Sequence, residues 1–104
     1  MDYIFEITDK TGRKVHLSKE RWKHILKHPF MHDQIENIKF TLEKPTEITY
    51  FEDNEKVRYF YKELKNRDNY EKYLMVAVKY LNGEGYIITS FFTNKIAGLK
   101  WKKR

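Results

Sequence analysis

Residues 74–79 read Leu-Met-Val-Ala-Val-Lys, the most apolar run of the chain followed directly by a lysine. A short apolar run between turn-rich segments is typical of a strand that is buried on both faces. We therefore expect residues 72–81 to form the central strand of a sheet. Side chains alternate between the two faces of a strand, so Lys79 shares a face with Met75 and Ala77. Its charge either reaches solvent past the strand end or projects from the sheet towards a ligand.

The segments that flank this run also show the period of two that is typical of strands. Residues 46–51, 56–62 and 85–93 are the candidates. The links between the four strands contain turn-forming residues, and residues 82–85, Asn-Gly-Glu-Gly, are the clearest hairpin turn. These links predict that the four strands follow one another in an antiparallel meander.

The N-terminal part of the chain predicts a hairpin and then two helices. Residues 3–8 and 13–17 read as short strands that are joined by a turn. Ser18 is a good N-cap for a helix over residues 19–28. Pro29 ends that helix, because the residue before a proline disfavours helical geometry. A second amphipathic helix follows and ends at the next proline.

Together these segments predict a single α+β domain over residues 1–104. In this arrangement the N-terminal hairpin is followed by two helices packed on one face of a four-stranded antiparallel sheet. The helices need that face because their apolar stripes have no other partner. Residues 94–99 are expected to form a last helical turn before a basic C-terminal end.

Charge and composition favour a polyanionic partner. The chain has 104 residues, with 21 Lys and Arg against 15 Asp and Glu, a formal net charge of +6, and 16% aromatic residues. Cationic side chains bind phosphates and aromatic rings stack on bases, so RNA is a plausible ligand. The absence of cysteine excludes disulfides and thiolate sites. We expect a cytoplasmic protein without a membrane partner, because the sequence shows neither a signal peptide nor a long apolar stretch.

His24 and His28 lie four residues apart in the first predicted helix. A helical projection puts them opposite the apolar face of Trp22, Ile25 and Leu26, and therefore outside the core. They are either solvated surface residues or proton-transfer groups, since histidine has the unperturbed pKa nearest neutrality. A zinc site of the metalloprotease type requires a glutamate directly after the first histidine, where Ile25 stands. No nearby carboxylate or cysteine completes a metal site, so we expect no cofactor.

Three further polar residues stand inside predicted strands. Arg58 lies between bulky residues of the strand 56–62, Lys79 follows the central apolar run, and Thr89 lies within the strand 85–93. A set of histidine, arginine, lysine and hydroxyl suits metal-free cleavage of RNA. That reaction needs a base for the 2′-OH, an acid for the leaving 5′-oxygen and cations for the charge at phosphorus. The RNA supplies its own nucleophile.

The order of these motifs resembles a known family. The helix motif Trp-x-His-Ile-x-x-His-Pro at 22–29 is followed by Arg-Tyr-Phe-Tyr at 58–61, the strand 73–79, Ile-Thr-Ser-Phe at 88–91 and a late Gly-x-x-Trp at 98–101. This pattern is similar to the phage-type barnase–EndoU–colicin–RelE-like nuclease domains, over about residues 20–101. The helix motif and the apolar strand that ends in lysine are its specific parts.

The resemblance implies metal-independent ribonuclease chemistry on the open face of a four-stranded antiparallel sheet. It implies that His24 or His28 transfers protons, that Arg58 and Lys79 bind phosphate, and that Thr89 supports them. Phe91 stands where the family pattern suggests a tyrosine, which puts full activity in question. A helix that covers the sheet with Trp22 turns its histidines towards solvent. They reach the site only from the helix edge, or if the helix packs along the sheet margin.

The preferred hypothesis is therefore a small endoribonuclease, toxin-like, that an antitoxin or immunity protein restrains. Its substrate stays open among tRNA, ribosome-bound message and free RNA. One alternative is a non-catalytic RNA-binding module of the same fold. Another is a protein-interaction domain whose positive charge is incidental.

Overall fold

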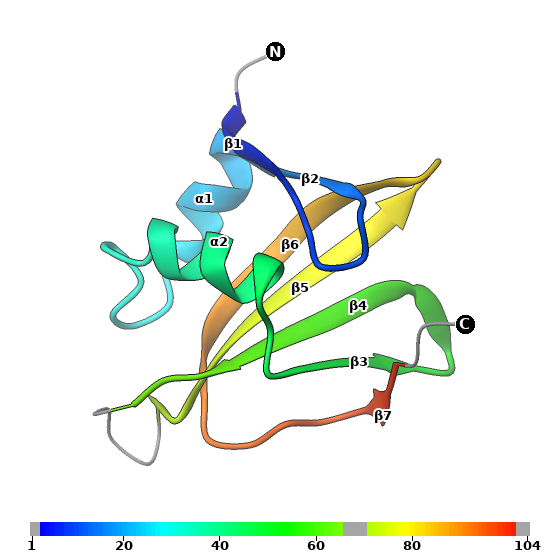
Figure 1. Cartoon of the computed structure of the whole chain (residues 1–104). Helices are drawn as coiled ribbons and strands as arrows, with labels where there is room; N and C mark the ends of the chain where they lie inside the picture. Colours follow the sequence, from blue (N-terminus) through cyan, green and yellow to red (C-terminus); the bar gives the residue numbers. More distant parts are fainter. Residues whose placement is uncertain (1–2, 66–70, 102–104) are drawn as a thin grey trace.

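A computed structural model of the chain describes residues 3–65 and 71–101. Along these residues the order of elements is β1 (Tyr3–Thr8), β2 (Lys14–Ser18), α1 (Lys19–Ile25), α2 (Ile35–Glu43), β3 (Glu47–Phe51), β4 (Asn54–Glu63), β5 (Tyr73–Leu81), β6 (Glu84–Thr93) and β7 (Leu99–Lys100). The strands form one sheet in the order β1-β2-β6-β5-β4-β3-β7 (Figure 1). None of the helices in the two described ranges is long and apolar enough to cross a membrane.

This architecture corrects the expected fold class. The meander β3-β4-β5-β6 is antiparallel throughout, but it is not a separate four-stranded sheet with helices packed on it. The N-terminal hairpin joins the same sheet, because β2 pairs in parallel with β6 through Val15↔Gly85 and His16↔Tyr86. At the other edge, β7 pairs with β3, and it starts at Leu99, where a helical turn was expected. The result is a seven-stranded mixed sheet.

The parallel contact between β2 and β6 is short and closely packed. Gly85 has no side chain, and a Cβ built there would lie 2.7 Å from Val78 Cγ1 and 3.0 Å from Val15 Cγ2. An isolated two-stranded hairpin is only marginally stable and exposes unpaired backbone groups at both edges. Pairing with β6 covers one of these edges.

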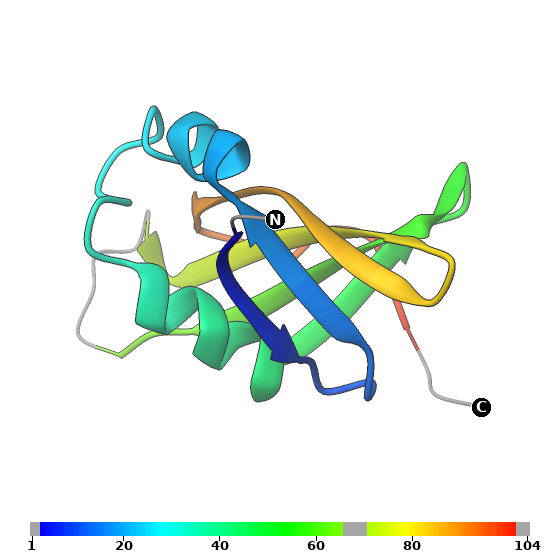
Figure 2. The same cartoon turned by 90° about the horizontal axis from the view of Figure 1, so that it is seen from above.

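The core lies between one face of the sheet and α2. We call this face the inner face. Ile38 and Leu42 of α2 are fully buried, as are the inner-face side chains of the hairpin and of the meander, namely Val15, Leu17, Phe60, Leu74, Val76 and Val78. Burial of one such side chain contributes about 1.5–3 kcal/mol, so this layer dominates the stability of the fold. Figure 2 shows α2 and the hairpin on the same side of the sheet.

Helix α1 has a different position, beside β6 and β2 (Figures 1 and 2). The Ser18 side chain accepts a hydrogen bond from the Arg21 amide at 3.1 Å and begins the helix. Ile25 is fully buried, whereas Leu26 is 43% exposed and does not belong to the inner stripe that was predicted. The helix ends at Ile25, three residues early, and a turn continues it through His28, whose amide donates to the Ile25 carbonyl.

Candidate active site

The face of the meander that points away from α2 carries most of the predicted site residues. We call it the outer face. Ala77 is the register partner of Tyr59 on β4 and of Thr89 on β6, and the three side chains therefore share this face. Met75, which lies two residues before Ala77 on β5, likewise pairs with Tyr61 and Phe91. Apart from Thr89, these residues belong to a second, smaller apolar cluster in which Met75, Ala77 and Tyr61 are buried.

Part of the outer face is covered by the segment between β6 and β7. Ile96 packs on the second cluster, and the Thr49 hydroxyl donates to the Ala97 carbonyl at 2.6 Å. Gly98 has a positive φ of 99° and passes close to Thr49, where a side chain does not fit without strain. The segment therefore lies over β3 and β4. It does not cover the β5 and β6 side of the outer face, where Thr89 and Lys79 lie.

His28 comes to this surface from the side of β6. Its Nε2 atom lies 3.3 Å from the Thr89 hydroxyl oxygen, within hydrogen-bond distance. Its ring also lies 5.2 Å from the Phe91 ring. Because α1 packs beside β6, the turn that follows the helix brings His28 to the outer face. This is one of the two arrangements that allow these histidines to reach the sheet.

His24 stands beside His28, on the exposed side of α1. The two imidazole centroids are 5.8 Å apart and the rings meet edge to face. His24 is exposed, whereas His28 is half-buried between the helix end and β6. The structure therefore brings His24, His28 and Thr89 together, with His28 between the other two.

Lys79 belongs to the same outer face, two residues beyond Ala77 on β5. The register shifts between Ala77 and Val78, so the partner of Lys79 on β6 is Tyr86. Lys79 is exposed, and none of the described residues forms an ion pair with it. It thus adds a positive charge to the face that carries Thr89.

Arg58 is the one predicted residue that the fold separates from the others. Its register partner is Val78, whose side chain lies in the core, so Arg58 projects from the inner face. Its guanidinium carbon lies 5.7 Å from the ring centres of both Tyr50 and Trp101. The sheet therefore lies between Arg58 and His28.

Tyr59 was not singled out from the sequence, although it lies on the outer face opposite Ala77. Burial raises the pKa of the Tyr59 phenol above its usual value, and the neighbouring Tyr61 and Asp53 raise it further. The phenol therefore keeps its proton at neutral pH and remains a hydrogen-bond donor. The alternation of Tyr59 and Tyr61 along the strand was the sequence signal, but which face they occupy depends on the pairing with β5.

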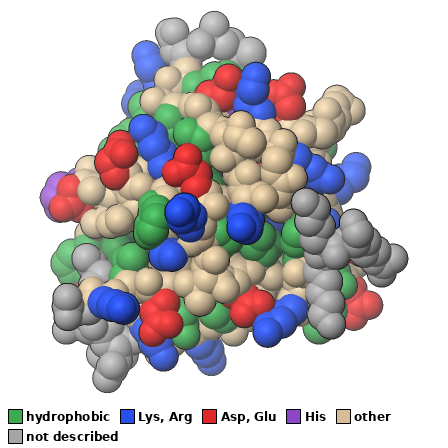
Figure 3. Space-filling view, viewed as in Figure 1, with side chains coloured by type: hydrophobic (Ala, Val, Ile, Leu, Met, Phe, Trp, Pro, Cys, Tyr) green, Lys and Arg blue, Asp and Glu red, His purple; other side chains and the backbone are tan. Residues whose placement is uncertain are grey.

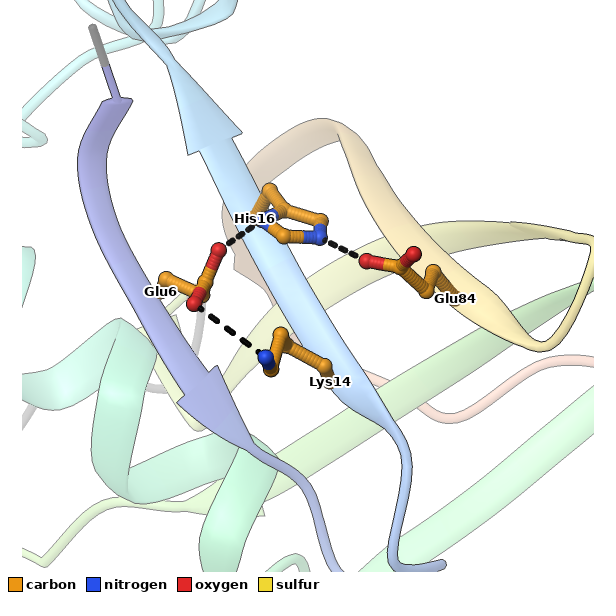
Figure 4. Close-up of polar contacts among 4 residues, drawn as sticks. All are labelled: Glu6, Lys14, His16 and Glu84. Atoms are coloured by element: carbon orange, nitrogen blue, oxygen red, sulfur yellow. Dashed lines mark hydrogen bonds and ion pairs between the residues drawn. The ribbon is translucent and has the colours of Figure 1, made fainter. Parts of the chain in front are cut away.

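His16 is a second residue that the sequence did not reveal (Figure 4). It is 5% exposed and lies between two carboxylates, with Nδ1 2.8 Å from Glu6 and Nε2 2.6 Å from Glu84. Its ring stacks on Tyr86, with the centroids 5.2 Å apart. Tyr86 is in turn the register partner of Lys79. His16 thus joins β1, β2 and β6 next to the candidate site, and its partners come from segments too distant in sequence to be matched by local patterns.

The arrangement can move protons and bind an anion. Two imidazoles and a hydroxyl meet at the β6 side of the outer face, and Lys79 adds an ammonium group to the same face. Over the described ranges, no group of three or more His, Cys, Asp or Glu side chains is placed to hold a metal ion. The chemistry available to these side chains is general acid–base catalysis next to a bound phosphate.

Comparison with known proteins gives one match. The family model described as phage-Barnase-EndoU-ColicinE5/D-RelE like nuclease2 matches residues 5–104. No curated protein and no solved structure matches the chain.

Proposed function

Because this chain belongs to the phage-Barnase-EndoU-ColicinE5/D-RelE like nuclease2 family, we propose that it is a metal-independent endoribonuclease with its active site on the outer face. The observation that carries this proposal is the contact between His28 and Thr89, with His24 beside it and Lys79 on the same face of the sheet. A nuclease domain acts on nucleic acid, and this group of side chains is suited to cleaving RNA in particular.

The reaction uses the 2′-OH of the RNA as nucleophile. One imidazole, of His28 or His24, removes the 2′-OH proton while the oxygen attacks phosphorus. The bond from phosphorus to the 5′-oxygen breaks, and the leaving oxygen takes a proton from the second imidazole. The products are a 2′,3′-cyclic phosphate and a free 5′-OH. Thr89 restrains the His28 ring by a hydrogen bond and thereby fixes its orientation.

The charge that develops on the phosphoryl oxygens needs cationic or donor groups nearby. Lys79 is the cation on this face, and the protonated phenol of Tyr59 is a donor on the opposite side of Ala77. Arg58 has no part in this proposal, because its side chain lies on the inner face.

The proposal is tested by incubating the protein with total RNA and with tRNA in the presence of EDTA. We expect cleavage that leaves 2′,3′-cyclic phosphate ends. Intact RNA at a large excess of protein overturns the proposal, as does cleavage that stops in EDTA. DNA of the same sequence serves as the control, since it lacks the nucleophile and stays intact.

A non-catalytic RNA-binding module is the second candidate. The observation that favours it is the Phe91 ring, 5.2 Å from His28, at the position where the family pattern suggests a hydroxyl. This candidate predicts salt-dependent RNA binding that survives His28→Ala, with no cleavage by the wild-type protein.

We further propose that the activity is toxic to the cell that makes the protein and is restrained by an acidic antitoxin or immunity protein. The net charge of +6 favours an acidic partner. Induced expression should arrest growth and degrade cellular RNA, and His28→Ala should relieve both effects. Equal toxicity of the two proteins contradicts this part of the proposal.

A further inference from the structure

Two arginines from distant segments meet at one end of the inner face. Arg13 lies in the turn between β1 and β2, and its guanidinium carbon is 5.0 Å from the centre of the Tyr80 ring. Tyr80 is two residues beyond Val78 on β5, and Val78 is the register partner of Arg58. Arg13 and Arg58 therefore flank the same end of β5, on the side of the sheet away from His28.

Within residues 3–65 and 71–101, two acids lie near these positive charges: the charge of Glu55 attracts Arg58, and Asp9 accepts a hydrogen bond from the Arg13 amide. Neither guanidinium forms an ion pair there, and the hydrogen bond of Arg58 goes to the Glu55 carbonyl. The carboxylate of Asp9, in the same turn as Arg13, accepts hydrogen bonds from the Tyr80 phenol, from Thr11 and from the Arg13 amide, and it forms no ion pair with the Arg13 guanidinium. Burial lowers the pKa of Arg58, and the nearby charge of Arg13 lowers it further. An anion between them removes this repulsion.

Positive charge alone does not define a site on this side of the molecule. Figure 3 shows Lys and Arg side chains spread over the side that carries α2 and the hairpin, with Asp and Glu among them. Arg13 and Arg58 differ from a general cationic surface because they approach each other over aromatic rings and are not paired with acids.

A cavity lies beside Trp101, whose ring is close to Arg58, although neither arginine lines it. It has a volume of about 430 Å³ and is lined by Lys10, Thr11, residues 45–48 and Trp101. Trp101 belongs to both places, because its ring also contacts the Arg58 guanidinium. Glu47 is the acid in the lining, and its carboxylate lies 3.9 Å from Lys100. The volume is in the range of small-ligand pockets, and an indole wall favours a flat aromatic ligand.

We propose that this inner-face cavity binds a nucleotide, with the phosphate between Arg13 and Arg58 and the base against Trp101. The guanidinium fork matches phosphate oxygens, and an indole offers a stacking surface for any base. The site is separate from the candidate active site, because the sheet lies between them. The nucleotide is either free in solution or part of an RNA strand that continues around the molecule.

The experiment follows backbone and indole resonances of the ¹⁵N-labelled full chain during titration with AMP, adenosine and a 2′-O-methyl RNA hexamer. AMP should shift the amides of Thr11 and Arg13 and the Trp101 indole. Adenosine should bind at least about tenfold more weakly, because it lacks the charged phosphate that accepts hydrogen bonds from the guanidinium groups. If the hexamer competes with AMP, the site binds an RNA strand. If the hexamer does not compete with AMP, the site binds free nucleotides.

Variants distinguish a specific phosphate-binding site from non-specific attraction by the positive charge of the protein. Arg58→Ala and Arg13→Ala should each weaken AMP binding about tenfold. Arg13 is exposed in a turn, so its variant tests the proposal even if Arg58→Ala unfolds. Lys27→Ala, which removes one exposed charge elsewhere, should leave the affinity unchanged. Equal binding of AMP and adenosine, or equal effects of Arg13→Ala and Lys27→Ala, overturns the proposal. Because no step measures cleavage, the result is independent of the proposed ribonuclease activity.

Discussion

His28 Nε2 lies 3.3 Å from Thr89 Oγ1, and this contact joins two residues that are 61 positions apart in the sequence. It connects the turn after α1 to the middle of β6, on the face of the sheet that α2 leaves open. The contact depends on where α1 packs. A helix placed over the inner face, as the apolar stripe alone suggests, would have kept its histidines away from Thr89.

Removal of the His28 imidazole should lower RNA cleavage by about 100- to 10,000-fold, the usual contribution of a positioned acid or base. We expect a loss in kcat with little change in KM for His28→Ala. Thr89→Val, which keeps the shape and removes the hydroxyl, should have a smaller effect in the same direction. His32→Ala is the matched control, because it removes an exposed imidazole outside the site. Equal activity of His28→Ala and His32→Ala contradicts the assignment.

Lys79 should act through the phosphate. Lys79→Ala should weaken RNA binding and reduce the slope of log affinity against log salt by about 0.7, the value for one lost contact to a single strand. Fluorescence anisotropy at several salt concentrations measures this slope. Lys62→Ala is the control, since that amino group donates to the Lys44 carbonyl on the inner face. A similar change of slope in both variants would show that Lys79 contributes only general charge.

The sequence predicted the central strand because its signal is local. Leu74, Val76 and Val78 are fully buried on the inner face, and Met75 and Ala77 are nearly buried on the outer face. An apolar run without alternation reports burial on both faces, whatever the neighbouring strands are. The antiparallel meander could be predicted as well, because the turn-forming residues between its strands are also a local signal.

The position of the hairpin in the sheet could not be predicted in the same way. The pattern of β2 indicates a strand but not its neighbour, and the partner Gly85 lies 70 positions beyond Val15. Both Gly83 and Gly85 read as turn residues. Gly83 has a positive φ of 83° in the turn, whereas Gly85 lies in β6, where it is needed for close packing.

The candidate site was only partly predictable for a related reason. Lys79 pairs with Val57, and Arg58 pairs with Val78. This register puts the two cations on opposite faces, and a shift of one strand by one residue would put both on the same face. Neither strand by itself contains that information. His28 and Thr89 could be named from residue type and motif, but their contact depends on the packing of α1.

Gly85→Ala should destabilise the fold by overpacking. The added Cβ would lie 2.7 Å from Val78 Cγ1 and 3.0 Å from Tyr80 Cε1 and Val15 Cγ2. We expect the free energy of unfolding to fall by about 1–3 kcal/mol. The double variant Gly85→Ala/Val78→Ala should lose less than the sum of the two single changes, because the smaller side chain makes room. Additive losses in urea unfolding would argue against this packing.

His16→Leu should also destabilise the fold, because it leaves the carboxylates of Glu6 and Glu84 facing each other without a shared partner. Both acids are partly exposed, so solvent screening limits the loss to about 1–3 kcal/mol. Urea unfolding at pH 7 measures it. Lys14→Ala removes an exposed ion pair of Glu6 at 3.6 Å and should change stability by less than about 0.5 kcal/mol. An unchanged stability of His16→Leu would show that the contacts of His16 with Glu6 and Glu84 do not stabilise the fold.

Tyr80 should make the stability fall at alkaline pH. Burial raises the pKa of its phenol well above the usual value of 10.0, and the hydrogen bond to Asp9 raises it further. Above about pH 10 the unfolded chain therefore loses this proton while the native protein keeps it. The unfolded state then binds fewer protons, so the free energy of unfolding decreases with pH, by up to about 1.4 kcal/mol per unit.

Tyr80→Phe isolates this effect. At pH 8 the variant should be less stable by about 1–3 kcal/mol, because the Asp9 carboxylate loses a buried donor. The variant has no phenol to ionise at this position, so its stability falls less steeply above pH 10. The difference between the two proteins should therefore shrink between pH 8 and pH 11 in urea unfolding. A difference that stays constant over this range contradicts a raised pKa for Tyr80.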